Sequence, residues 1–133
     1  MIVSSSKAER IVDDILSFDE GILSAGVIDR SGNIIADKSS ESFGKQFEVG
    51  RLEGNKYSGT LVVAALRIAN EVNDGFGEPQ ALVTIYRDCK LMLLSMPSHS
   101  ILIGVALKRS ANVDNDKTID EIERLVGAVL KPQ

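Results

Sequence analysis

The sequence predicts an α+β domain with one five-stranded antiparallel sheet, in the order helix, strand, strand, helix, strand, strand, strand, helix. Two capping-box spacings, Ser6 with Glu9 and Thr118 with Glu121, precede amphipathic stretches at the two ends of the chain. A glycine-containing turn, Arg30–Asn33, joins two strand-like runs into a hairpin. Three further strand-like runs have connections of hairpin length between them, which requires an antiparallel arrangement.

Composition indicates one soluble domain spanning residues 1–133, with 44% hydrophobic and 26% charged residues. A net charge of −4 disfavours nucleic acid and anionic membrane as partners. The single Cys89 and single His99 leave no intramolecular disulfide and no zinc cluster. There is no signal-like start and no long apolar span. We therefore expect a cytoplasmic protein without a cofactor.

The first helix is expected to begin at Ser6, with Gly21 available to release the chain after it. Its apolar stripe comprises Ile11, Val12, Ile15, Leu16 and Phe18. The following run, Ile22–Asp29, has apolar or small residues on both alternating faces, which is typical of a central strand covered on both sides. Asn33–Asp37 continues as the second strand of the hairpin.

The middle of the chain contains a long irregular segment and then a helix. Residues 38–57 are polar and rich in glycine, which suggests a lid, a partner-binding loop or an unrecognised element. The helix is predicted for residues 61–73, where Val62, Val63 and Leu66 extend the apolar surface beyond one face. We expect a second surface to pack against these additional apolar side chains.

The last part of the chain predicts strands at Gln80–Arg87, Lys90–Met96 and Ile101–Arg109. Tight turns are expected at Asp88–Cys89 and at Pro97–Ser100. Met92 and Met96 alternate along their strand and are expected in the core, and residues 111–116 are expected to form a polar loop. The final helix has its apolar stripe at Ile119, Ile122, Val126 and Val129.

No group of residues predicts catalysis. The segment 54–60 resembles a phosphate loop only loosely, because its lysine precedes the second glycine, so Ser58 or Thr60 is expected simply to cap the helix. His99 is expected to be an exposed turn residue without a nucleophile, and Cys89 an unactivated thiol. The acids at 114–120 lack the glycine and distal glutamate of a calcium loop.

The order of elements, with the hairpin Val-Ile-Asp-Arg-Ser-Gly-Asn-Ile-Ile-Ala at 27–36 after a short helix, resembles the roadblock family of dynein-light-chain-like proteins. The resemblance covers residues 9–130 and implies a roadblock/profilin-like fold, with the first and last helices on one face of the sheet and the central helix on the other. It also implies a non-enzymatic homodimer that binds or regulates a Ras-like small GTPase or a signalling complex. The long 38–57 segment departs from the family pattern.

In such a dimer two copies of the helix at 61–72 would pack together, and two copies of the strand at 81–86 would pair. The strand supports this independently, because it contains neither proline nor charge, and natural proteins rarely leave such a strand on a free edge. The alternative is an internal strand, with residues 38–57 covering the helix. The predicted interface residues are Leu61, Val62, Val63, Leu66, Arg67, Asn70, Ala81, Val83 and Ile85.

A second functional hypothesis is a small-molecule sensor of the PAS or GAF type. Its ligand would lie beneath Phe43, Phe47 and Tyr57. The strand and helix order is similar in both classes of protein, so topology alone separates them poorly.

Overall fold

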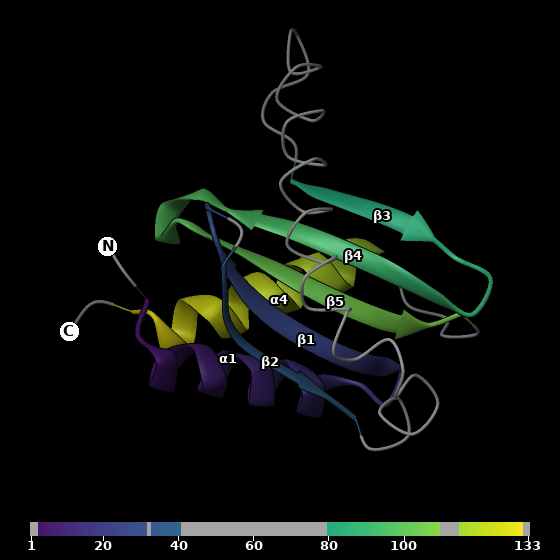
Figure 1. The fold of residues 1–133 in the computed structure, drawn as a ribbon, viewed down its shortest axis with the longest axis horizontal. Helices are drawn as coiled ribbons and strands as arrows, with labels where there is room; N and C mark the ends of the chain where they lie inside the picture. The colour runs from purple at the N-terminus through teal and green to yellow at the C-terminus, as the bar shows by residue number, and fades with distance from the viewer. Residues whose placement is uncertain (1–2, 32, 41–79, 110–114, 132–133) are drawn as a thin grey trace, which may run out of the picture.

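The computed structural model describes residues 3–31, 33–40, 80–109 and 115–131. These residues form a five-stranded sheet in the order β2-β1-β5-β4-β3, with antiparallel pairing throughout (Figure 1). The elements are α1 (Ser5–Phe18), β1 (Ile22–Asp29), β2 (Ile34–Ser39), β3 (Ala81–Ile85), β4 (Cys89–Met96), η1 (Pro97–His99), β5 (Ile101–Lys108) and α4 (Asn115–Val129). The predicted α+β class, the single antiparallel sheet and the meander of its last three strands are confirmed.

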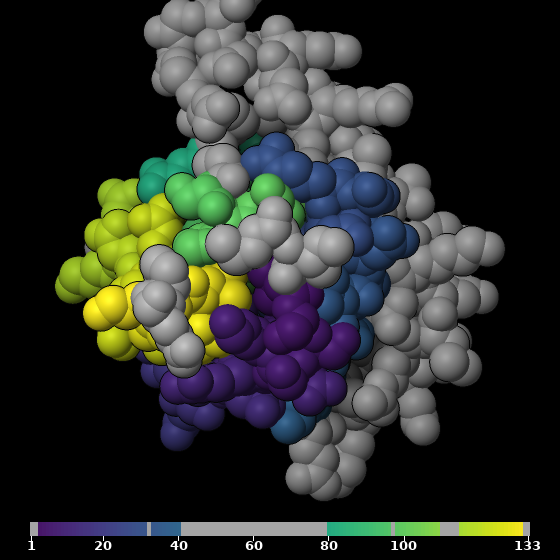
Figure 2. Space-filling view, turned by 90° about the vertical axis from the view of Figure 1, so that its left-hand side faces the viewer, coloured from purple at the N-terminus to yellow at the C-terminus, as the bar shows by residue number. Residues whose placement is uncertain are grey.

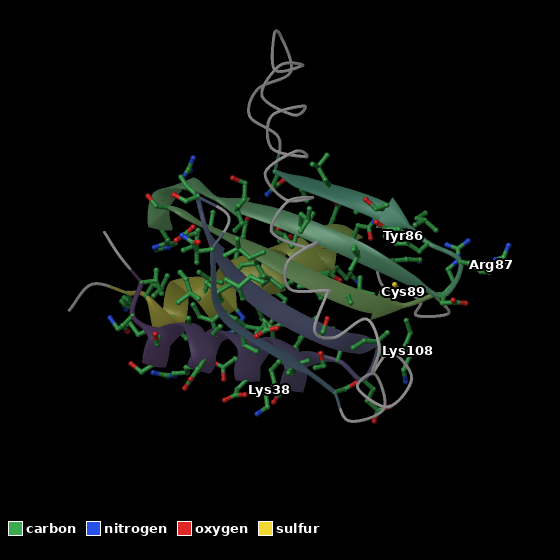
Figure 3. The ribbon with its side chains drawn as sticks, in the orientation of Figure 1. Lys38, Tyr86, Arg87, Cys89 and Lys108 are labelled. Atoms are coloured by element: carbon green, nitrogen blue, oxygen red, sulfur yellow. The ribbon has the colours of Figure 1, made fainter. Side chains whose placement is uncertain are left out.

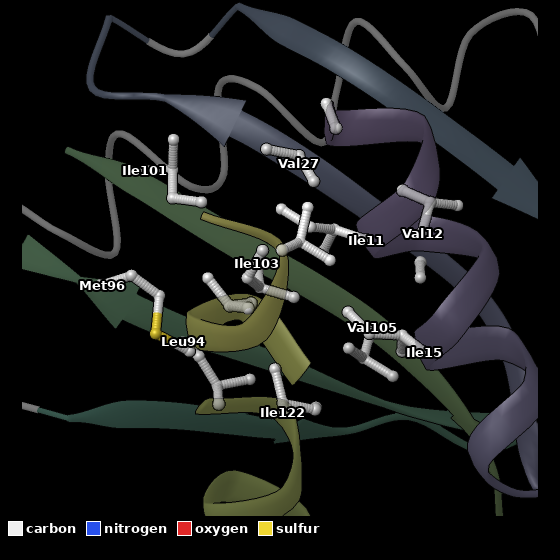
Figure 4. Packing of buried hydrophobic residues seen from close by; sticks show 14 of the residues in the cluster. Ile11, Val12, Ile15, Val27, Leu94, Met96, Ile101, Ile103, Val105 and Ile122 are labelled. Carbon is white, nitrogen blue, oxygen red and sulfur yellow. The ribbon is translucent and has the colours of Figure 1, made fainter. Parts of the chain in front are cut away.

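Helices α1 and α4 lie side by side on one face of the sheet (Figures 1 and 2). Ile11 and Ile15 of α1 and Ile122 of α4 are fully buried, at 0% exposure. They meet a row of sheet side chains that includes Val27, Leu94, Met96, Ile101, Ile103 and Val105 (Figure 4). Burial of these aliphatic groups between two layers is the main driving force for this half of the fold.

The opposite face of the sheet has its own, smaller apolar cluster. Ile28 and Leu102 are each 4% exposed, and Ile34 and Leu93 pack against them. Because Val27 is fully buried on the helical face while its neighbour Ile28 is buried on the other, the prediction that β1 is covered on both sides is confirmed. The central helix predicted at 61–73 lies outside the described residues.

Both helices begin earlier than the capping boxes predicted. Ser4, rather than Ser6, is the N-cap of α1, since its Oγ accepts a hydrogen bond from Lys7 N at 3.3 Å. Helix α4 already includes Asn115, so Thr118 is an internal residue, 1% exposed. Glu121 forms an ion pair with Arg124. The predictions were wrong because several neighbouring serines offer the same hydroxyl, and because a helix tolerates polar residues such as Asp116 in its first turn.

Other boundaries shift by one or two residues. Strand β2 continues to Ser39, so the irregular segment predicted from residue 38 does not begin there, and residues 41–57 lie outside the described part. Cys89 begins β4 instead of lying in the turn. Phe18 is 37% exposed at the end of α1 and does not belong to its buried stripe.

The first hairpin is held by the carboxylate of Asp29. Its Oδ1 accepts hydrogen bonds from Ser31 N and Asn33 N, both at 2.9 Å, and its Oδ2 accepts one from Asn33 Nδ2 at 3.1 Å. This local closure is the reason that an aspartate followed by small and polar residues predicts a turn here. Among the described residues, no helix is long and apolar enough to cross a membrane.

Candidate interaction surface

The strand β3 lies at one edge of the sheet and pairs only with β4 within the described residues. Tyr86 N donates to Cys89 O at 2.8 Å, and Ser95 N donates to Gln80 O at 3.1 Å. Since hydrogen-bonding groups alternate along an antiparallel strand, the even-numbered residues of this segment point their backbone groups at β4. The amides and carbonyls of Ala81, Val83 and Ile85 therefore point outward, away from the sheet.

The side chains of this strand add an apolar surface to the outward backbone groups. Val83 is 39% exposed, Ile85 is 59% exposed, and the adjacent Tyr86 is 42% exposed. Their side chains, with those of Leu82 and Thr84, carry no charge. An uncharged edge strand with exposed β-branched residues is a ready template for pairing with another strand.

Both ends of this edge strand are fixed within the fold. At its start, Gln80 Nε2 donates to Glu123 Oε1 of α4 at 2.9 Å. At its end, the hydrogen bond from Tyr86 to Cys89 closes a tight connection through Arg87 and Asp88. The strand is therefore already extended, so little conformational entropy is lost when it pairs with a partner.

The opposite edge is chemically different. Strand β2 exposes Asp37 and Lys38, and Lys38 Nζ lies 3.0 Å from Asp13 Oδ1 of α1. Charged residues are the usual means by which natural sheets discourage pairing at an edge.

Three of the predicted interface residues, Ala81, Val83 and Ile85, are thus placed together on an exposed edge. Ala81 is half-buried against the core, while the other two are exposed. The remaining predicted interface residues, Leu61, Val62, Val63, Leu66, Arg67 and Asn70, lie outside the described residues. The sequence identified the apolar strand, but the direction of its backbone groups required the register with β4.

The other candidate residues take up unremarkable positions. Cys89 is partly buried, and burial together with the carboxylate of Asp88 raises the pKa of its thiol, which disfavours a reactive thiolate. His99 is partly buried in η1 rather than exposed, and its Nδ1 is buried with no hydrogen-bond partner among the described residues. Within the described ranges, no three His, Cys, Asp or Glu residues gather as metal ligands would.

Comparison with known proteins defines the fold more closely. Neither protein-family models nor curated protein sequences match the chain. Among solved structures, a roadblock/LC7 domain from Streptomyces avermitilis is 14% identical, with a TM-score of 0.68 over 90% of this chain and 91% of that one. MglB from Myxococcus xanthus is also 14% identical, with a TM-score of 0.64 over 100% of this chain and 97% of that one. A structure described as MglB with tetrameric arrangement is 15% identical, with a TM-score of 0.60 over 98% and 96% of the two chains.

The described elements therefore define an α+β domain with two helices on one face of an antiparallel sheet. More particularly, the chain has the roadblock/LC7 fold. The fold expected from the sequence resemblance is confirmed. At this level of identity, the comparison establishes the shared architecture.

Proposed function

We propose that this protein is a non-enzymatic interaction module that forms a homodimer by pairing β3 with its own copy. The observation that carries the proposal is the combination of outward backbone groups at Ala81, Val83 and Ile85 with uncharged side chains, of which those of Val83 and Ile85 are exposed. A second copy supplies the same edge, so a two-fold arrangement satisfies both at once. The structural neighbour described as tetrameric supports the view that this fold assembles with copies of itself.

The pairing has a natural register. If the two-fold axis passes beside Val83, that residue faces Val83 of the second copy, and Ala81 faces Ile85. Every outward amide and carbonyl of β3 then finds a partner. The predicted helix at 61–72 would pack with its copy beside this seam, through Val63 and Leu66.

The partner that we propose for the dimer is a Ras-like small GTPase or a complex that contains one, in a cytoplasmic signalling role. This part rests on the resemblance to the roadblock family, and the structural likeness to MglB and to a roadblock/LC7 domain supports it through the shared fold. The mechanism is surface recognition, so no residue is assigned a catalytic role.

The dimer is tested by measuring mass in solution by light scattering over a range of concentrations. The wild-type protein is expected at twice the 14.4 kDa chain mass. Val83→Pro is expected to give a folded monomer, because the amide it removes points outward and is not used by β4. Val63→Asp is expected to do the same if the helix packs at the seam.

The matched control is Thr84→Pro, one residue further along. Thr84 pairs with Leu91 and directs its amide at β4, so proline there removes a hydrogen bond inside the subunit and is expected to lower the stability of the fold. A wild-type protein that stays monomeric at all concentrations, with native circular dichroism, rules out the dimer.

The GTPase partner is tested separately, by affinity purification from the native cell lysate with quantitative mass spectrometry. A Ras-like GTPase is expected to be enriched on the wild-type protein, and to bind again when purified and mixed with it. Recovery of no GTPase removes that part of the proposal and leaves the dimer standing.

A further inference from the structure

A group of basic side chains lies at one end of the sheet, beyond the apolar edge of β3. Arg87 is in the connection between β3 and β4, Lys108 is the last residue of β5, and Arg109 follows it. The register brings these segments together, since Lys108 lies opposite Cys89. Figure 3 shows Tyr86, Arg87, Cys89 and Lys108 at this same end, well apart from Lys38. We call Tyr86, Arg87, Lys108 and Arg109 the basic end.

At this end of the sheet, a row of three side chains crosses neighbouring strands: those of Tyr86, Cys89 and Lys108. The backbone amide of Tyr86 donates a hydrogen bond to the carbonyl of Cys89, and Cys89 lies opposite Lys108 on the next strand. Facing residues on neighbouring strands place their side chains on the same face, so Tyr86, Cys89 and Lys108 share one. That face is opposite the one covered by α1 and α4, because Met92 and Leu107, which alternate with Cys89 and Lys108, are in the helical core.

The cations of the basic end form no ion pairs within the described part of the chain. Lys38 is paired with Asp13, and Arg124 with Glu121. Arg87, Lys108 and Arg109 are exposed and, like Lys7 and other exposed cations, have no such pair among the described residues; what distinguishes them is that they lie together. Against Asp88, the one acid among them, three basic residues leave a local charge of +2 in a chain whose net charge is −4.

The surroundings of the basic end limit the kind of partner. Asp19 and Glu20 precede Gly21, whose carbonyl accepts a hydrogen bond from Lys108 N at 2.8 Å, so acidic residues border the cations on the β1 side. A long polyanion such as duplex DNA, or an anionic membrane surface, would meet these acids as well as the cations. The basic end suits a partner whose negative charge is confined to a small area.

The side chain of Tyr86 points to the chemistry of that partner. It is 42% exposed beside Arg87, and tyrosine and arginine are the residue types enriched in the energetically dominant parts of protein interfaces. We propose that the basic end is a docking surface for an acidic protein segment, with carboxylates that pair with Arg87 and Lys108 and an apolar side chain that packs on Tyr86. Tyr86 borders the proposed β3 seam, but Arg87, Lys108 and Arg109 lie beyond the strand, so binding at the basic end requires neither pairing of β3 nor a GTPase partner.

The test is a titration of the isotopically labelled full-length protein with a short synthetic peptide in which glutamates surround one leucine, followed by NMR. Amide shifts are expected at residues 86–89 and 107–109. The double substitution Arg87→Glu with Lys108→Glu is expected to weaken binding about tenfold or more, because it removes two charged contacts and places like charges opposite the peptide carboxylates. Tyr86→Ala is expected to weaken binding while leaving the charges in place.

The control changes net charge by the same amount elsewhere. Lys7→Glu with Lys131→Glu alters two exposed lysines on the helical side and is expected to leave binding within about twofold of wild type, since long-range charge effects are screened at physiological salt. A peptide with glutamines in place of glutamates is expected not to bind.

The proposal is overturned if both double variants lose binding equally, or if the shifts lie outside the basic end. It is also overturned if a short DNA duplex or phosphatidylserine vesicles bind the same residues more tightly than the acidic peptide does. Folding of every variant is checked by circular dichroism, and a failed variant is replaced by Arg87→Gln with Lys108→Gln.

Discussion

Val83 and Met92 face each other directly on neighbouring strands, yet Met92 is fully buried whereas Val83 is 39% exposed. At this pair the hydrophobic core of the described chain reaches β4 but not β3, and the β3 side chain that packs against the core is that of Ala81, at the start of the strand. Strand β3 is attached by its ladder of hydrogen bonds and by Gln80, more than by burial of its own side chains. That difference makes β3 the element whose behaviour distinguishes a subunit alone from a subunit in an assembly.

Truncating Ile103, a fully buried residue of the core, tests the described packing. Ile103→Ala is expected to lower the free energy of unfolding by about 2–5 kcal/mol, because it leaves a cavity between the sheet and the two helices. Ile103→Val is the graded comparison and is expected to cost about 0.5–1.5 kcal/mol. Urea unfolding followed by circular dichroism measures both. An alanine variant as stable as the wild type contradicts the central position of Ile103.

The start of α1 tests which serine caps the helix. Ser4→Ala is expected to destabilise the protein by about 1 kcal/mol, since it removes the acceptor for the amide of Lys7. Ser6→Ala is the matched control and is expected to have an effect within about 0.5 kcal/mol. Thermal unfolding of the two variants gives the comparison, and the reverse order of effects supports the capping box predicted from the sequence.

The thiol of Cys89 is expected to be slow to react. Burial and the neighbouring Asp88 raise its pKa, so at about pH 8.5 the folded protein holds less thiolate than an unfolded chain does. Iodoacetamide is expected to alkylate the folded protein several-fold more slowly than the protein in urea. Asp88→Asn is expected to restore only part of the alkylation rate. It removes the carboxylate but leaves burial, which is the larger cause of the raised pKa.

The same shift has a consequence for stability. A raised pKa in the folded state means that the folded protein holds its proton where the unfolded chain has lost it. The contribution of Cys89 is therefore fully present below the ordinary thiol pKa and declines as the pH rises through the raised value. Cys89→Ser is expected to make the protein less sensitive to alkaline pH, and an unchanged pH profile contradicts this assignment.

The register proposed for the dimer is tested by crosslinking in a Cys89→Ser background. Val83→Cys faces its own copy across a separation of about 5.5 Å between Cα atoms, within the range of a disulfide. Ile85→Cys lies about 14 Å from its copy in the same register. Mild oxidation is expected to give covalent dimer with the first variant and very little with the second. Efficient crosslinking of the second variant alone indicates a different register.

The sequence predicted the described fold well, for a physical reason that is visible in β1 and the last three strands. Strand β1 is buried on both faces, so its continuous apolar run has no other stable place. The short connections at Arg87–Asp88 and at Pro97–Ser100 leave antiparallel pairing as the only arrangement. The resemblance to the roadblock family added which faces the helices cover.

Helix ends and the basic end were less accessible to sequence reasoning. Ser4 and Ser6 offer the same hydroxyl, and which one caps α1 depends on how the helix meets the sheet. Arg87 and Lys108 are separated by about twenty residues along the chain, and only the pairing of β4 with β5 brings them together. The apolar character of Val83 and Ile85 was visible, whereas their outward backbone groups depend on the register of β3.

The two edges of the sheet have opposite tendencies, and this limits how far the sheet extends by edge pairing. On β2, Asp37 and Lys38 are exposed, whereas β3 has no charged side chain. An edge of each kind gives every subunit one surface that accepts a further strand and one that resists it. Once two copies join through β3, the new outer edges are both of the charged kind. Growth by this route stops at a pair, which separates a finite assembly from an open fibre.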